Sequence, residues 1–395
     1  MRFMRHLGNV LWHRASLRVD QACSPIAINA RNYSTNIAAP SDADIDSARK
    51  YCVNQLKHGD YEAYLIRHFL PPPAQDAYDA LRTLNLELSR MPEAVSNPTL
   101  GRMRMQFWRD AISNTFDGRP PREPISVLLH RSITKLKERA GPGSVGSLKF
   151  WLLRFLSTRE QHLDNRPFAN LNALEEYAEN TYATLMYLTL ASIPIQSVHM
   201  DHLSSHIGKA CGIVAILRSI PVLTMPPRPV ENPSGSLVGS SRPPALLLPL
   251  DVMAKVGLKE EDVFRQGPHA EGLQDAVYQV ATRANDHLIT VREMLKNLQS
   301  GQGPGHNYEH QHEAEHVHTS PAQDTQDIAV EIRRGFGVLL EAITAHSYLK
   351  SLEGSNFDPW RVKRSWRLPW SLWKAAKRRS AALAREPGMT LDWGL

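Results

Sequence analysis

Helical periodicity dominates this chain from about residue 42 to residue 352, and it limits the fold more than any other feature. Apolar residues recur at three- and four-residue spacing, as in Ala77, Leu81, Leu84 and Leu88, whereas no segment shows convincing strand alternation. The predicted helices cover residues 45–58, 74–90, 100–116, 125–139, 148–162, 171–193, 198–220, 272–298 and 327–352. The sequence therefore predicts an all-α, single-domain helical bundle over residues 42–355.

The bulk composition excludes several classes of protein. The 395 residues are 42% apolar, enough to bury a large core. The net charge of +6 is uneven, because residues 1–41 hold five arginines against one aspartate, so no nucleic-acid partner is expected for the body. Three cysteines make neither a disulfide framework nor a Cys-rich metal site, and they fit a reducing compartment. The longest apolar stretch, Leu185–Ile193, is too short to span a bilayer.

Residues 1–35 have the composition of a mitochondrial transit peptide. They are rich in Arg, Ser, Ala and Asn, nearly free of acids, and carry apolar residues that could line one helix face. The segment from Arg31 through Tyr33 and Ser34 is typical of a matrix processing site. The alternative interpretation is a basic tail without a targeting role.

Two segments interrupt the helical pattern. Residues 224–244 hold six prolines with interspersed Gly and Ser, which predicts a flexible insertion. Residues 300–321 are rich in Gly and His, and histidines two or four residues apart can chelate Zn²⁺ or Cu²⁺. This second segment lacks the apolar residues of a rigid metal site, so a solvated linker between two helices is the preferred interpretation.

An ordered series of motifs runs from residue 51 to residue 352. The motifs are Asp60 to Leu70-Pro71, Ala80 to Ser89, Arg104 to Trp108-Arg109 with Gly118 and Pro120, Tyr177 to Thr181, Gly208 to Arg218, and Leu248-Pro249. Together they resemble the squalene/phytoene synthase family. The resemblance implies an isoprenoid-synthase-like helical bundle and a head-to-head condensation of prenyl diphosphates. It also implies two Asp-x-x-x-Asp motifs, whose carboxylates hold the Mg²⁺ ions that stabilise the diphosphate leaving group.

All four of those carboxylate positions are changed in this chain. The first motif reads Asn85 and Ser89, and the second reads Ser219 and Leu223. The degraded motifs predict no catalytic residue, no metal and no cofactor.

Other charged residues are candidates to substitute for the missing carboxylates. Glu87 is two residues from Asn85 and points away from the same helix face. Glu175, Glu176 and Glu179 could reach a central cavity, although the ordinary interpretation of Glu175 and Glu176 is a solvated first helical turn. Two cations could still hold an anion without metal, namely Lys209 and Arg218. The ordinary interpretation of Arg218 is a structural ion-pair partner.

Within the family, the sequence resembles a mitochondrial branch that acts in biogenesis of NADH:ubiquinone oxidoreductase, respiratory complex I. The resemblance lies in residues 82–88, 102–108, 177–181 and 205–210. It implies a non-catalytic matrix protein, peripheral on the inner membrane, whose partners are complex I subunits or other assembly factors. Two alternatives stay open: a prenyl-diphosphate transferase with rearranged ligands, and a module that binds an isoprenoid or another lipid.

The C-terminal tail, residues 356–395, is rich in tryptophan and basic residues. Residues 356–380 hold four tryptophans and eight Lys or Arg but only one acid, Asp358. This composition suits a membrane surface or a partner, while RNA binding and packing on the body are the alternatives. Pro369 argues against one continuous helix. The predicted contact residues are Trp360, Arg364, Trp366, Arg367, Trp370, Trp373 and Lys374.

Overall fold

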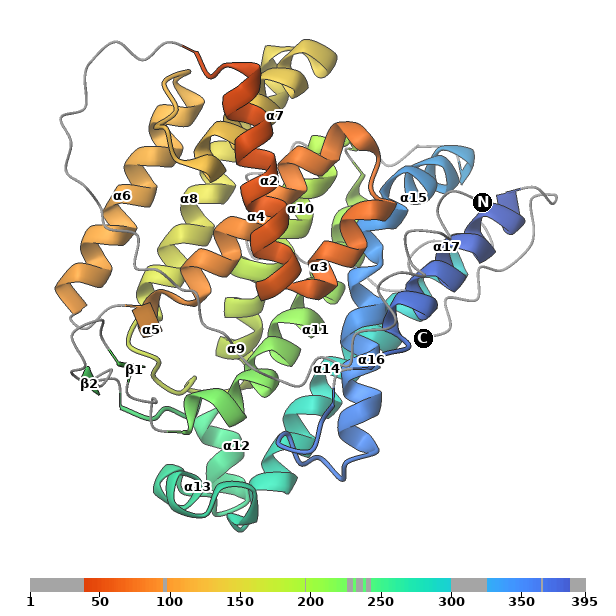
Figure 1. Ribbon diagram of the computed structural model, residues 1–395. Helices are drawn as coiled ribbons and strands as arrows, with labels where there is room; N and C mark the ends of the chain where they lie inside the picture. The colour runs from red at the N-terminus through yellow and green to blue at the C-terminus, as the bar shows by residue number, and fades with distance from the viewer. Residues whose placement is uncertain are drawn as a thin grey trace. The chain divides into compact units, whose positions relative to one another are not determined.

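The described residues of the computed structural model are almost entirely helical (Figure 1), which confirms the all-α prediction. The structure describes residues 39–94, 98–195, 197–225, 230–231, 237–238, 243–299, 325–363 and 365–383. The proposed transit peptide, the His-rich segment and Arg364 lie outside these ranges.

The helices follow one another along the chain with short connections. They are α2 Asp42–Gly59, α3 Tyr61–Ile66, α4 Pro72–Ser89, α5 Met91–Ala94, α6 Pro98–Phe116, α7 Pro124–Ala140, α8 Gly146–Gln161, α9 Leu171–Ala178, α10 Thr184–Ser192, α11 Val198–Leu223, α12 Leu250–Lys255, α13 Glu260–Gln266, α14 Leu273–Gln299, α15 Thr325–Leu339, α16 Glu341–Glu353 and α17 Leu368–Leu383. Single turns are η1 Arg67–Phe69, η2 Pro142–Val145, η3 Glu179–Ala183 and η4 Gly267–His269. Within the Pro-rich insertion, β1 Val230–Glu231 pairs antiparallel with β2 Leu237–Val238.

Several helix starts are fixed by residues just outside the apolar pattern. Ser41 and Asp44 form a reciprocal capping box at the start of α2. The carboxylate of Glu123 accepts hydrogen bonds of 2.8 Å from the backbone N–H groups of Ile125 and Ser126, and so caps α7. Because caps extend a helix beyond its apolar stripe, both helices begin slightly earlier than periodicity alone predicts.

The remaining differences from the predicted helices have local causes. The predicted helix over residues 171–193 contains a π-helical turn, η3, and the predicted helix over residues 327–352 divides at Leu340 into α15 and α16. The short helices α3, α5, α12 and α13 have too few residues to show a period. Helix α17 begins at Leu368, so Pro369 lies in its first turn, where a missing N–H costs no helical hydrogen bond.

The apolar core consists of two clusters. The larger one surrounds α11, which packs against α9, η3, α10, α14, α15 and α16. The smaller one lies among α2, α4, α6, α7 and α8. The crossing of α11 over η3 and α9 is close because Gly208 and Gly212 lie at the contact. A Cβ on Gly208 would stand only 2.3 Å from the Cα of Ala183.

Among the helices that the structure describes, α11 alone is long and apolar enough to cross a membrane by composition, with a mean hydropathy of 1.4. More than half of this apolar stretch is buried inside the bundle. Because other helices surround α11, its high hydropathy is that of a helix buried in the core of the bundle.

Candidate functional site

The first expected carboxylate position, Asn85, lies buried on α4. Its side-chain oxygen accepts a hydrogen bond from Nη2 of Arg159, whose Nη1 donates to the hydroxyl of Tyr177. The guanidinium of Arg159 also lies 5.4–5.7 Å from the ring centroids of Phe155, Tyr177 and Tyr182. Its Nε has no hydrogen-bond partner within the described part of the chain. A buried cation, rather than an open ligand site, therefore lies against Asn85.

The other three motif positions engage only their own surroundings. Ser89 is exposed, and its hydroxyl donates to the carbonyl oxygen of Leu86 at 2.9 Å. The hydroxyl of Ser219 donates to the carbonyl oxygen of Ile216 at 2.7 Å, and Leu223 is buried in the core. Such contacts stabilise a helix locally but offer no charged oxygen to a metal ion.

A cluster of charges, with Arg82 and Glu341 buried and Asp60 half-buried, lies around α4 one turn before Asn85. Nη2 of Arg82 donates to the carboxylate of Asp60 at 2.8 Å, and Nη1 lies 3.3 Å from Glu341, which also accepts a 3.0 Å hydrogen bond from Tyr78. Burial raises the pKa of Glu341 above its ordinary value. For Asp60, burial acts in the same direction, but the charges of Arg82 and Arg218 and the hydrogen bonds from Arg82 and the backbone N–H of Ala63 together leave the pKa lowered. The cluster ties the start of α3 to α4 and α16.

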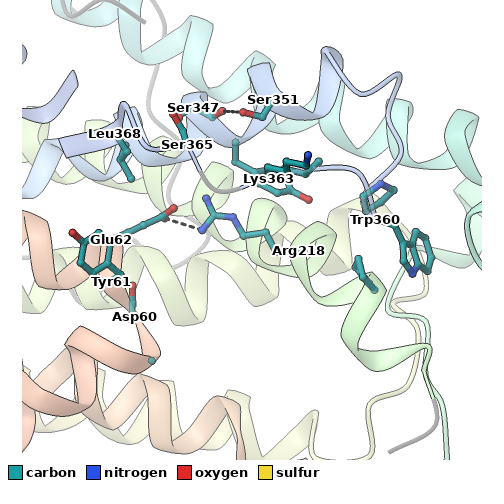
Figure 2. A pocket seen from close by; sticks show the side chains of 15 residues that line it. Asp60, Tyr61, Glu62, Arg218, Ser347, Ser351, Trp360, Lys363, Ser365 and Leu368 are labelled. Atoms are coloured by element: carbon teal, nitrogen blue, oxygen red, sulfur yellow. Dashed lines mark hydrogen bonds and ion pairs between the residues drawn. The ribbon is translucent and has the colours of Figure 1, made fainter. Parts of the chain in front are cut away.

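A cavity of about 420 Å³ lies between the start of α3, α11, α16 and the segment that precedes α17 (Figure 2). Its lining combines charged groups, hydroxyls and aromatic rings, from Gly59, Asp60, Tyr61, Glu62, Arg218, Pro221, Ser347, Tyr348, Ser351, Pro359, Trp360, Val362, Lys363, Ser365 and Leu368. The hydroxyl of Tyr348 is buried and has no hydrogen-bond partner in the residues that the structure describes. The cavity is thus chemically suited to a small ligand with polar groups.

The structure separates the two predicted anion contacts. Arg218 lines the cavity, where its Nη1 lies 2.7 Å from the carboxylate of Glu62 (Figure 2). Its guanidinium stands 4.7 Å from the ring centroid of Tyr348. Lys209 is not among the lining residues and lies 3.7 Å from Glu179. Because both cations have carboxylate partners, neither is an uncompensated charge that requires an anion.

Comparison with known proteins decides the family. The model of the family described as squalene/phytoene synthase matches residues 56–374, most of the chain. The chain belongs to the squalene/phytoene synthase family. The matched range includes α4 and α11, which carry the changed motif positions, and it confirms the resemblance seen in the sequence.

Relatives of known name match over most of their length. A protein of Rattus norvegicus named NADH dehydrogenase (ubiquinone) complex I, assembly factor 6, is 31% identical over 86% of this chain and 84% of its own. The Homo sapiens protein of the same name is 33% identical over 67% of this chain and 71% of its own. The branch expected from the sequence is therefore confirmed.

Two solved structures show the same fold. A dehydrosqualene synthase aligns with a TM-score of 0.55 and 14% identity, over 87% of this chain and 99% of that one. The squalene synthase HpnC from Alicyclobacillus acidocaldarius aligns with a TM-score of 0.54 and 10% identity, over 81% of this chain and 98% of that one.

The Mg²⁺ ions that the squalene/phytoene synthase family implies do not fit the residues at these positions. Mg²⁺ requires hard oxygen ligands, whereas the four positions offer an amide, two hydroxyls bonded to their own helices, and a leucine. The guanidinium of Arg159 occupies the amide oxygen of Asn85 and would repel a second cation. Glu87 accepts a 3.3 Å hydrogen bond from Tyr51. Over the described ranges, no group of three or more His, Cys, Asp or Glu side chains could hold a metal ion.

Glu175 does not lie in a solvated turn, which differs from the ordinary interpretation of its sequence. Its carboxylate accepts hydrogen bonds from Arg283 and, at 2.7 Å, from Nε2 of His287. Burial alone would raise the pKa of Glu175, but these two partners lower it to about 2. The contacts continue inward, because Nδ1 of His287 lies 2.9 Å from Nδ1 of His206. Glu176 is exposed, as expected.

The tail residues divide between two locations. Trp360 lines the cavity, whereas Trp366, just before α17, and Trp370, in its first turn, are 76% and 50% exposed. Sequence reasoning missed the cavity residues of α16, Ser347 and Tyr348. Ser347 and Ser351 share a helix face by their spacing, but no local signal says that this face meets the start of α3.

Proposed function

We propose that this protein is a non-catalytic assembly factor for NADH:ubiquinone oxidoreductase, respiratory complex I, in the mitochondrial matrix and peripheral on the inner membrane. The similarity over 86% of the chain to a protein named complex I assembly factor 6 carries this proposal. The basic, acid-poor leader supports a mitochondrial location. The partners would be complex I subunits or other assembly factors.

The chemistry of the motif positions supports the non-catalytic part of the proposal. Ionisation of an allylic diphosphate needs strong stabilisation of the leaving group, which the family supplies through metal ions. This chain has Arg159 against Asn85 instead, and its nearby charges Arg82, Asp60 and Glu341 pair with one another. The interior groups therefore stabilise the bundle, and recognition of partners falls to its surface.

The assembly role is tested in cells that lack the protein. Native gels should show loss of assembled complex I, with the other respiratory complexes unchanged, and re-expression of the full chain should restore it. Normal complex I in these cells would overturn the proposal.

The absence of catalysis is tested on the purified protein. Incubation with Mg²⁺ and farnesyl or geranylgeranyl diphosphate should release no pyrophosphate above the protein-free rate. Repeated turnover would instead establish a prenyl-diphosphate transferase with rearranged ligands.

One observation favours a second candidate function, a module that binds an isoprenoid or another lipid. The 420 Å³ cavity is lined by Arg218 and Tyr348, and the guanidinium of Arg218 lies 4.7 Å from the ring centroid of Tyr348. Mass spectrometry of the native protein would detect a retained ligand. A ligand-free protein would leave only the assembly role.

A further inference from the structure

Helix α17 has a buried face and an open face. Leu368, Leu372 and Ala375 follow helical spacing and are 3%, 0% and 6% exposed, so this face belongs to the larger core cluster. Helix α17 packs against α16 through it (Figure 1). Because one face is anchored in the core, the opposite face is held in a fixed orientation.

Aromatic rings and basic groups gather on the open face. Trp366 is 76% exposed and Trp370 is 50% exposed. Trp370 stacks on Trp373, with ring centroids 4.7 Å apart and an interplanar angle of 22°. Removing a large tryptophan ring from water is favourable, and rings on an anchored helix leave water only when another surface covers them. Their exposure therefore marks an interaction surface.

A basic side chain lies over the ring of each of these tryptophans. The guanidinium of Arg367 lies 5.1 Å from the ring centroid of Trp366. The ammonium of Lys374 lies 5.7 Å from the Trp370 centroid, and that of Lys377 lies 5.0 Å from the Trp373 centroid. Residues 365–383 contain no Asp or Glu at all, so the whole segment has one sign of charge.

The chemistry of this face favours a lipid surface over a nucleic acid. Single-stranded RNA stacks its bases on open ring faces. Here Trp370 and Trp373 already stack on each other, and lysines lie over both rings. A bilayer interface needs no open ring face, because indole rings lie among the headgroups while Lys and Arg attract anionic phosphates. With 16 residues, α17 offers about 24 Å of length along such a surface.

We propose that the open face of α17, formed by Trp370, Trp373, Lys374 and Lys377, together with Trp366 and Arg367 just before the helix, binds the surface of an anionic phospholipid bilayer. The helix lies in the plane of the headgroups, and its core-facing side packs against the rest of the helical bundle. This inference deepens the proposed peripheral location, on which it rests, by assigning the contact to one helix face and to one lipid chemistry.

Vesicle flotation with the purified full chain tests the proposal at physiological ionic strength. The probes are phosphatidylcholine vesicles with and without cardiolipin. The wild-type chain should float with the cardiolipin vesicles and not with the neutral ones. Lys374→Glu/Lys377→Glu should weaken binding at least tenfold, since each basic residue near an anionic surface contributes about 1 kcal/mol. Trp366→Ser/Trp370→Ser should weaken it about tenfold through loss of apolar burial.

Matched variants on other helices control for general effects of charge and exposure. Lys255→Glu/Lys259→Glu makes the same charge change at α12 and α13, and Phe107→Ser/Phe150→Ser removes two exposed rings from α6 and α8. Both controls should bind within about twofold of wild type, because they leave the α17 contacts unchanged. The basic leader is identical in every variant, so it cannot produce the difference. Unchanged thermal unfolding shows that the variants fold.

Three results would overturn the proposal: no binding by the wild-type chain, equal binding to neutral vesicles, or equal loss in the control variants. Retention on native membranes without binding to protein-free vesicles would instead assign the face to a protein partner. Re-expression in cells that lack the protein tests the assembly role separately from vesicle binding. If the wild-type chain ignores vesicles yet restores complex I, only the bilayer contact fails.

Discussion

Arg159 on α8 donates a hydrogen bond to the side-chain oxygen of Asn85 on α4, so a cation contacts the position at which the resemblance to the family predicts its first metal-binding carboxylate. Restoring that carboxylate would therefore place it against a guanidinium before any metal ion could reach it.

Asn85→Asp should stabilise the fold without creating a magnesium site. An ion pair with Arg159 would replace the hydrogen bond from its guanidinium to a neutral amide, and we expect a net gain of about 1 kcal/mol after the cost of burying the carboxylate. Thermal unfolding should therefore shift upward at neutral pH and stay unchanged on Mg²⁺ addition. Ser89→Asp, on the exposed end of the same helix, is the control and should not stabilise. A Mg²⁺-dependent shift in Asn85→Asp would contradict the role of Arg159.

The sequence predicts the fold well because its main signals are local. The apolar spacing of Leu81, Leu84 and Leu88 lies within one helix, and the substitution at Asn85 is visible in the motif itself. The contact of Arg159 with Asn85 has no such signal, because it depends on how α8 packs beside α4. The same holds for the cavity, whose walls come from distant segments of the chain.

Gly208→Ala should destabilise the bundle at the crossing of α11 and η3. The added Cβ would lie 2.3 Å from the Cα of Ala183, and backbone atoms cannot yield as side chains do. The free energy of unfolding should fall by about 1–3 kcal/mol, although alanine is otherwise favoured in helices. Gly146→Ala is the control, since its φ of −58° is helical and no atom lies within 4 Å of its added Cβ. Equal stability of the two variants in chemical denaturation would contradict the close crossing.

Glu175→Gln should lower stability at neutral pH and flatten its dependence on acid. Hydrogen bonds from His287 and Arg283 lower the pKa of Glu175 from 4.5 to about 2, despite burial. The stabilisation is therefore complete above pH 4.5 and is lost as pH falls toward 2. At pH 7 the variant should lose about 2–3 kcal/mol. The exposed Glu176 gives the matched control, Glu176→Gln, and denaturant midpoints across this range should differ between the two variants.

Asp201→Asn should have the opposite effect, a gain in stability that appears only as pH rises. Burial, with the nearby charges of Glu331 and Glu179, raises the pKa of Asp201 from 3.8 to about 7. Below pH 3.8 the carboxyl is protonated in both states and contributes nothing, whereas its unfavourable charge grows up to pH 7. The variant should match wild type at acid pH and exceed it by about 2–4 kcal/mol in mildly alkaline buffer. Asp275→Asn changes an exposed acid in the first turn of α14, so it controls for the helix dipole. The measurement is a set of unfolding curves across this pH range. A stability difference from wild type that stays constant with pH in both variants would contradict the buried charge at Asp201.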